Sequence, residues 1–112
     1  MNLNTLDLNL LLVFDAVLRT GSTTLAGEEL GLTQSAVSNG LRRLRAAFDD
    51  PLFIKTPQGM SPTPMAERLA PSLREGLDRI RQALDDREDF LPAASQRQYV
   101  LYASDTGQRV FL

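Results

Sequence analysis

Apolar residues in the first fifty positions recur three and four residues apart, which is the spacing of one face of a helix. The first such run covers residues 6–20, and its apolar face consists of Leu10, Phe14, Val17 and Leu18. We expect this helix to end at Gly21, because glycine readily adopts the left-handed conformation that follows a last helical turn. A short second helix is expected at residues 24–30, ended by Gly31, and a third at residues 34–48.

A different pattern begins after the third helix. Two aspartates and a proline at residues 49–51 interrupt the helical spacing. Residues 52–63 then alternate loosely between apolar and polar and contain Pro57, Gly59 and Pro62. This combination is typical of a small hairpin, or wing, of two short strands.

Thr63 and Pro64 mark the start of a long helix, because threonine caps a helix N-terminus and proline suits the first helical position. We expect this helix to reach about Arg87, a length of roughly 36 Å at ~1.5 Å per residue. We also expect Pro71 to kink or loosen one turn. The apolar residues form one stripe along the helix: Met65, Leu69, Leu73, Leu77, Ile80 and Leu84.

The pattern of the last residues predicts an incomplete domain. Residues 99–104 have the pattern of one buried strand, and residues 105–112 resemble the opening of a helix. A single strand can neither bury its faces nor pair its edges. The last ~15 residues are therefore expected to be the beginning of a second, absent domain.

The amino-acid composition excludes several classes of functional site. The chain has 112 residues, a net charge of -2, and neither cysteine nor histidine. Disulfides and thiolate metal sites are thus excluded, and the commonest acid–base side chain is missing, so we predict no catalytic residue, no metal site and no cofactor. No apolar run approaches the ~20 residues of a membrane span, and residues 1–10 do not have the layout of a signal peptide, so a cytoplasmic location is expected.

A tight turn at residues 31–33 joins the expected second and third helices, and this arrangement is typical of a helix-turn-helix. One face of the third helix is apolar and is expected to pack on the first helix; it consists of Val37, Leu41, Leu44 and Phe48. The opposite face is polar and carries Gln34, Ser35, Ser38, Asn39, Arg42 and Arg45.

That polar face has the chemistry of a DNA-reading surface. Glutamine and asparagine can pair bidentately with adenine, and serine can bond to several base edges. Arg42 and Arg45 can reach phosphates, and Thr33 with the first N–H groups of the helix suits a phosphate oxygen. Residues 34–56 contain four basic and two acidic side chains, a local charge of +2, so Glu28 and Glu29 must face away from DNA.

Two other functions stay open on this pattern. A winged helix that docks a protein partner, with the long helix in the partner's groove, has the same periodicity. An enzyme is disfavoured, because neighbouring carboxylates such as Glu28 and Glu29 diverge on a helix and no pocket-forming sheet is predicted.

Several motifs occur in order along residues 26–64: Ala26-Gly27 with Leu30, Thr33-Gln34, Ala36-Val37-Ser38, Leu41-Arg42-Arg43-Leu44, Leu52-Phe53 with Lys55, and Pro62-Thr63-Pro64. Together they resemble the N-terminal region of LysR-type transcriptional regulators, in the branch that includes nodulation regulators and aromatic-degradation activators. Residues 95–105 are similar to the first strand of that family's effector domain.

The resemblance implies a mainly α fold in three parts. A winged helix-turn-helix DNA-binding domain would cover residues 6–63, with the helix-turn-helix at about 23–42 and the wing at about 52–62. A linker helix for dimerisation would cover residues 64–88. Residues 89–112 would form a hinge and the first strand of a truncated α/β effector domain.

The resemblance also implies a sequence-specific transcription factor that binds an inverted-repeat operator in double-stranded DNA as a dimer, or as a tetramer in the full-length protein. A small-molecule effector would act through the absent domain, and RNA polymerase is a further expected partner. The expected DNA-binding residues are Thr33, Gln34, Ser35, Ser38, Asn39, Arg42 and Lys55. The expected dimerisation residues are Leu69, Leu73, Leu77, Ile80 and Leu84, although Leu69 is also expected to pack partly on the first helix. Lys55 and Gln58 depart from the family pattern and leave the wing's minor-groove contact open.

Overall fold

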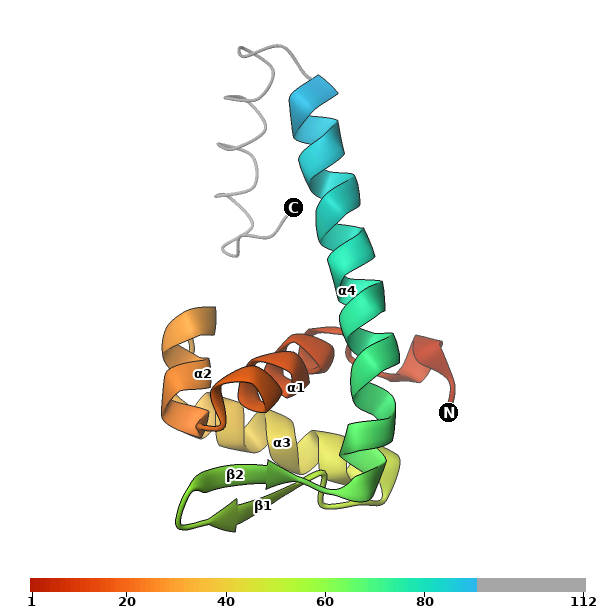
Figure 1. Ribbon diagram of the computed structural model, residues 1–112. Helices are drawn as coiled ribbons and strands as arrows, with labels where there is room; N and C mark the ends of the chain where they lie inside the picture. The colour runs from red at the N-terminus through yellow and green to blue at the C-terminus, as the bar shows by residue number, and fades with distance from the viewer. Residues whose placement is uncertain (91–112) are drawn as a thin grey trace. The chain divides into compact units, whose positions relative to one another are not determined.

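The computed structural model describes the backbone of residues 1–90 and the side chains of residues 1–87. A 3-10 helix, Leu3–Thr5, precedes α1 (Asn9–Thr20), α2 (Thr23–Leu30) and α3 (Gln34–Phe48). An antiparallel hairpin of β1 (Phe53–Thr56) and β2 (Gly59–Pro62) follows, and the long helix α4 (Pro64–Phe90) comes after it (Figure 1). The predicted mainly helical fold with a winged helix-turn-helix is confirmed, whereas the strand expected at residues 99–104 lies outside the described residues.

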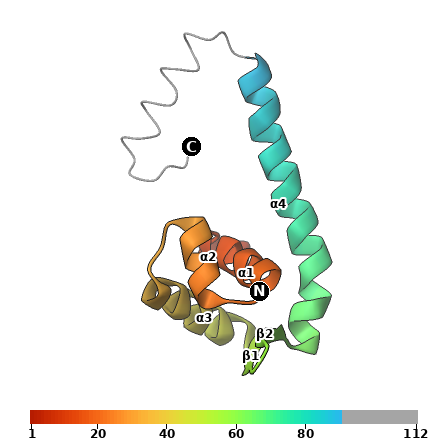
Figure 2. The same cartoon turned by 60° about the vertical axis from the view of Figure 1, so that its left-hand side comes forward.

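The helices α1, α2 and α3 lie together with the hairpin (Figure 2), and these elements share one hydrophobic core. Its largest fully buried side chains include Phe14 of α1 and Phe53 of β1, whose ring centroids lie 5.4 Å apart. The apolar face of α3 joins them through Val37, Leu41 and Leu44, as the sequence predicts. Burial of these side chains holds α3 firmly against the other elements, since core packing tolerates little displacement.

Most helix boundaries follow the predicted capping residues, although α2 starts one residue earlier than expected, at Thr23, and α4 reaches Phe90 rather than Arg87. Gly21 and Gly31 end α1 and α2 in the left-handed conformation, and Thr33 Oγ1 accepts a hydrogen bond from the Ala36 N–H at 3.0 Å. The start of α1 was expected at residue 6 but lies at Asn9. The carboxylate of Asp7 accepts the Asn9 N–H at 3.0 Å, so this aspartate precedes the helix and binds its first donor.

Two glycines are required because another backbone segment comes close. A Cβ atom on Gly27 would lie 2.7 Å from the carbonyl oxygen of Leu32, which agrees with the close packing that the sequence indicates there. Gly59 begins β2 with a φ of 116°, and a Cβ on it would lie 2.6 Å from the Gly21 carbonyl oxygen. The next residue, Met60, donates its N–H to that same oxygen at 2.9 Å, so the wing is docked on the turn between α1 and α2.

The carboxylate of Asp50 helps to fix the connection between α3 and the wing. Asp50 Oδ2 accepts the Leu52 N–H at 2.8 Å and the Thr63 hydroxyl at 2.7 Å. Leu52 is fully buried with a φ of 63°, a conformation that non-glycine residues adopt only when their surroundings hold them in it. Thr63 Oγ1 also accepts the Ala66 N–H at 3.2 Å, which confirms it as the cap of α4.

Residue contacts divide the chain into two units, Met1–Glu75 and the part from Gly76 onward. In the first unit, Ala66 is fully buried, and Met65, Leu69, Ala70 and Leu73 of α4 pack against the core. Helix α4 continues through Pro71, which cannot donate a hydrogen bond to the preceding turn. None of the helices within residues 1–90 is both long and apolar enough to cross a membrane.

Candidate nucleic-acid interface

The outward face of α3 carries the predicted base-reading residues. Gln34, Ser35 and Asn39 are exposed, and Ser38 is half-buried between them. Arg42 continues the same face one turn further along and is exposed as well. Because the opposite side of α3 is packed into the core, this face presents amides, hydroxyls and a guanidinium from a fixed backbone.

Three side-chain hydrogen bonds organise this face. Gln34 Nε2 donates to Thr23 Oγ1 of α2 at 3.2 Å, and an Arg42 terminal nitrogen donates to Asn39 Oδ1 at 3.2 Å. The hydroxyls of Thr33 and Ser35 lie 3.3 Å apart. The partner Thr23 was not among the predicted site residues, because its pairing joins positions eleven residues apart on different helices.

Arg45 has a structural partner instead of the phosphate contact that its sequence position suggests. Its Nε donates to the Pro51 carbonyl oxygen at 2.8 Å, and a terminal nitrogen donates to the Phe53 carbonyl oxygen at 3.4 Å. The guanidinium thereby ties the end of α3 to the segment that enters the wing. The expectation that Arg45 lies on the DNA-reading face is wrong, because the chain turns back after Asp49 and brings these carbonyls to it.

Lys55 lies on a different element from the other predicted DNA-binding residues. It is exposed on β1 and pairs with Met60 in the hairpin register. Gln58 is exposed in the turn between the strands, where its N–H donates to Thr56 Oγ1 at 3.2 Å. The wing therefore presents one lysine and one amide to solvent.

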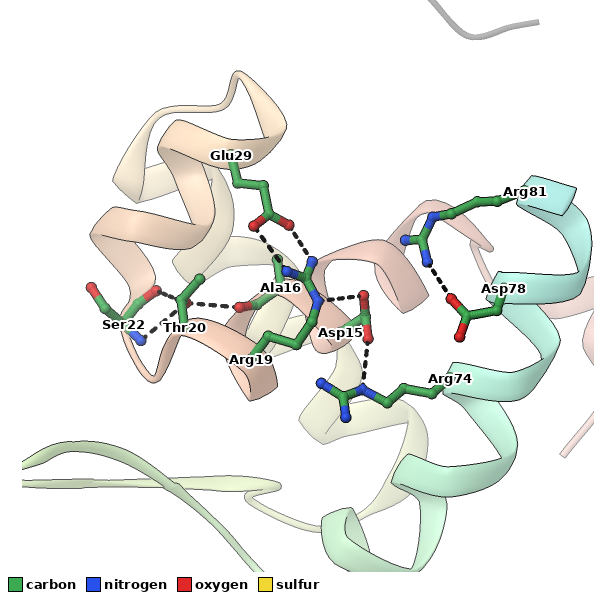
Figure 3. Close-up of polar contacts among 9 residues, drawn as sticks. All are labelled: Asp15, Ala16, Arg19, Thr20, Ser22, Glu29, Arg74, Asp78 and Arg81. Carbon is green, nitrogen blue, oxygen red and sulfur yellow. Dashed lines mark hydrogen bonds and ion pairs between the residues drawn. The ribbon is translucent and has the colours of Figure 1, made fainter. Parts of the chain in front are cut away.

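A network of charged side chains joins three helices away from the α3 face (Figure 3). Asp15 of α1 is only 3% exposed, and Arg19 donates from Nε to its Oδ2 at 3.0 Å. Arg19 also bonds both carboxylate oxygens of Glu29 on α2, and Arg74 of α4 lies 3.6 Å from Asp15 Oδ1. Hydrogen bonds to Glu29 and then to Asp15 raise the pKa of Arg19 above its ordinary value, so this guanidinium remains charged.

The predicted dimerisation residues fall into two groups. Leu69 and Leu73 pack against the core of their own chain and are half-buried, although the sequence assigned Leu73 to a partner chain. Leu77 is half-buried too, whereas Ile80 is 59% and Leu84 is 49% exposed. The exposed part of the stripe therefore begins within the unit that starts at Gly76.

The geometry of the described residues shows no metal centre. Within the described part of the chain, no group of three or more acidic side chains is placed to hold a metal ion. Glu29 is engaged by Arg19, and its neighbour Glu28 is exposed on α2. The candidate site is an exposed polar surface that can form hydrogen bonds and ion pairs.

Comparison with protein families matches residues 8–67 to the bacterial regulatory helix-turn-helix proteins of the lysR family. This chain belongs to the LysR family. The HTH-type transcriptional activator NahR of Pseudomonas putida is 46% identical over 112 residues, which is 100% of this LysR-family chain and 37% of NahR. Nodulation protein D 1 of Rhizobium leguminosarum bv. phaseoli is 40% identical over 111 residues, 99% of this chain and 35% of that protein. The chain thus spans about a third of the length of these relatives.

Solved structures agree with this assignment. The crystal structure of the probable transcriptional regulator PA0477 from Pseudomonas aeruginosa matches 80% of this LysR-family chain and 29% of its own, with a TM-score of 0.74 and 42% identity. A crystal structure of the BenM DBD with catB site 1 DNA matches 76% of this chain and 96% of its own, with a TM-score of 0.68 and 20% identity. The second likeness concerns the fold alone. The predicted family and its winged helix-turn-helix are both confirmed.

Proposed function

We propose that this LysR-family chain binds operator DNA as a homodimer, with α3 of each protomer in a major groove. The observation that carries the proposal is the outward face of α3, a row of amides and hydroxyls on a helix whose other face is locked in the core. An α-helix fits the major groove, where each base pair presents a distinct pattern of donors and acceptors. The fold shared with the BenM DBD, which has been solved with DNA, gives independent support.

Within this proposal, Gln34, Ser35, Ser38 and Asn39 read base edges. Their hydrogen bonds to Thr23 and Arg42 hold the two amides in place before DNA arrives, so less side-chain freedom is lost on binding. Thr33, Arg42 and Lys55 contact phosphates or the groove walls. Thr33 Oγ1 accepts the Ala36 N–H in the helix cap and lies 3.3 Å from the Ser35 hydroxyl, so one of these two hydroxyls keeps an O–H that can donate to a phosphate.

Dimerisation through the α4 stripe would place two recognition helices on one operator. The exposed side chains Ile80 and Leu84 supply apolar surface for the contact, with Leu69, Leu73 and Leu77 adding their uncovered parts. Two such helices suit an inverted repeat with half-sites about 34–36 Å, or one helical turn, apart.

The longer protein would respond to a small molecule, assemble as a tetramer and act on RNA polymerase in the cytoplasm. These further partners follow from the family resemblance. In this view the protein is a regulator and not an enzyme, since the site offers recognition chemistry only.

A binding experiment tests the proposal directly. Selection of DNA from a random pool by this chain would identify the half-site. Titration of the selected duplex and of a random duplex at two salt concentrations would then give the slope of log affinity against log salt concentration. We expect affinity to fall steeply with salt, because phosphate contacts release counterions. A protein-docking module would show little affinity and no slope.

Two variants separate base reading from phosphate contact. Ser38→Ala combined with Asn39→Ala should remove most of the preference for the selected duplex, at about 1–3 kcal/mol for each good base contact, while salt-sensitive binding to random DNA persists. Arg42→Ala should weaken binding to both duplexes and reduce the salt slope by about one unit. Equal losses in the two variants on both duplexes would contradict the assignment of the reading face.

A further inference from the structure

We propose that Arg45 is a positioning residue for DNA binding, because it holds the strained entry to the wing and thereby sets where Lys55 meets the DNA backbone. This inference rests on the proposed function, since it concerns how the wing and α3 of one protomer engage the same duplex. It gives a role in binding to an arginine whose guanidinium is bonded to backbone carbonyls of its own chain.

The segment that enters the wing contains a three-residue turn in an unfavourable conformation. The Phe53 N–H donates to the Pro51 carbonyl oxygen at 2.7 Å, and Leu52 between them has a φ of 63°. Turns that join residues two apart and have a positive φ at their centre are rare and strained. A conformation of this kind persists only where the surrounding contacts hold it. The entry to the wing therefore depends on the groups that bind it.

Two side chains hold this turn. The carboxylate of Asp50 accepts the Leu52 N–H at 2.8 Å. Nε of Arg45 donates at 2.8 Å to the Pro51 carbonyl oxygen, the same oxygen that closes the turn with Phe53. A hydrogen bond from a charged donor is stronger than one from a neutral donor. Loss of the Arg45 guanidinium should therefore weaken the support of the turn.

The pairing of the two strands explains why the Phe53 carbonyl is open to Arg45. The Thr63 N–H donates to the Leu52 carbonyl oxygen at 2.9 Å, so these two residues occupy a hydrogen-bonded pair position. The next pair, Phe53 with Pro62, is then a non-hydrogen-bonded pair, whose backbone groups point away from the partner strand. A terminal nitrogen of Arg45 donates to this outward Phe53 oxygen at 3.4 Å. The guanidinium thus reaches the outer edge of β1 where the strand begins.

The wing has a second attachment on its other strand. Met60 of β2 donates its N–H to the Gly21 carbonyl oxygen at 2.9 Å. Lys55 pairs with Met60 in the register and follows Phe53 by two residues, so both attachments bear on its position. Burial of Phe53 keeps β1 on the core, but apolar contact is non-directional. Without the Arg45 contact we expect the wing to pivot about its attachment at Met60 and to move Lys55 away from its place on DNA.

A double-mutant cycle measures whether Arg45 acts through Lys55. The duplex selected from the random pool is titrated at two salt concentrations with the native chain, Arg45→Met, Lys55→Ala and the double variant. We expect Lys55→Ala to weaken binding about fivefold and to reduce the salt slope by about one unit. Arg45→Met should weaken binding by about threefold to fivefold, and the double variant should bind within about 1.5-fold of Lys55→Ala.

Two further variants separate position from charge. Arg43→Met removes the same charge from α3 and is the matched control, because its guanidinium lies 3.4 Å from the Asp7 carboxylate and not at the wing. Its loss of affinity should multiply with that of Lys55→Ala. Arg45→Lys keeps the charge without the planar fork that reaches two carbonyls, so we expect an affinity between those of Arg45→Met and the native chain.

The outcomes decide between the proposals. If the losses from Arg45→Met and Lys55→Ala multiply, or if Arg45→Lys binds as tightly as the native chain, Arg45 acts by its charge and the positioning role is wrong. An unchanged affinity in Lys55→Ala, or the same coupling in the Arg43→Met control, also overturns it, while DNA binding stands.

A failure of the proposed function looks different, since the native chain would then bind the selected duplex no more tightly than a random one. Circular dichroism establishes that each variant has native helix content. Should Arg45→Met not fold, the cycle of Arg45→Lys with Lys55→Ala decides by the same rule.

Discussion

Helices α3 and α4 both carry apolar residues at helical spacing, but the protein covers the two stripes differently. On α3, Val37, Leu41 and Leu44 are all buried in the core of residues 1–75. On α4 the stripe passes from the half-buried Met65 and three half-buried leucines to Ile80 and Leu84 on the surface. Apolar periodicity therefore identifies which face of a helix favours packing against other apolar surface. Which element covers that face depends on the neighbours that the tertiary structure places beside it.

The difference has a functional consequence. A helix whose apolar face is completely packed has a fixed position, so the polar groups on its other face keep a defined geometry for recognition. A helix whose apolar face is partly exposed retains surface that can be removed from water by a second chain. In the proposed function these two stripes serve two tasks, presentation of a reading surface by α3 and assembly by α4.

Removal of one side chain from the α3 stripe should have the largest effect. Leu44→Ala is expected to lower the free energy of unfolding by about 2–5 kcal/mol, because it leaves a cavity in a close-packed core. Urea unfolding at a protein concentration where sedimentation detects monomer gives the value. Leu84→Ala is the matched control on the α4 stripe and should stay within about 0.5 kcal/mol of the native chain. Similar losses in both variants would remove the contrast between the helices.

A charge on the exposed stripe should affect assembly rather than folding. Ile80→Glu is expected to raise the dimer dissociation constant by about tenfold to a hundredfold, because an apolar contact worth about 1.5–3 kcal/mol is replaced by a carboxylate that must be desolvated. Analytical ultracentrifugation measures this constant. Gln82→Glu introduces the same charge at an exposed position two residues away, which lies on another side of the helix, and should leave assembly nearly native. A strict monomer in the native chain at micromolar concentration would refute the dimer seam.

The N-terminal caps of α3 and α4 should give the smallest difference in the free energy of unfolding. Thr33→Ala removes one cap from α3 and should cost about 1 kcal/mol. Thr63→Ala should cost more, up to about 2 kcal/mol, since the Thr63 hydroxyl caps Ala66 and also donates to the Asp50 carboxylate that holds Leu52. Thermal unfolding of the two variants ranks the losses, and serine at either position should recover most of the stability. The reverse order would show that the Asp50 contact contributes little.

Much of the fold could be predicted from local patterns. The ends of α1 and α2 at Gly21 and Gly31, the cap at Thr33 and the hairpin after residue 51 all depend on a few neighbouring residues. The start of α1 was misplaced by three residues, because apolar spacing alone does not reveal that Asp7 binds the first helical donor.

The candidate site was predictable to a similar extent. Helical periodicity was enough to group the exposed polar residues of α3, since both faces of one helix can be read from its spacing. Periodicity could not separate Arg45 from Arg42, although the first binds the wing's backbone and the second remains on the outward face. The carbonyls that receive Arg45 come from a segment that returns only after the chain has turned.

The sequence by itself determined which faces of the helices are apolar, where each helix stops and which chemical groups project from α3, because these properties depend on residues within one or two turns of one another. Only the tertiary structure decided that Val37, Leu41 and Leu44 of the α3 stripe are buried while Phe48 at its end is half-buried, that Arg45 supports the wing, and that Asp15 is buried between arginines of α1 and α4. Those contacts join segments far apart in the chain, and the free energy of burying one against another exists only when the whole core has assembled.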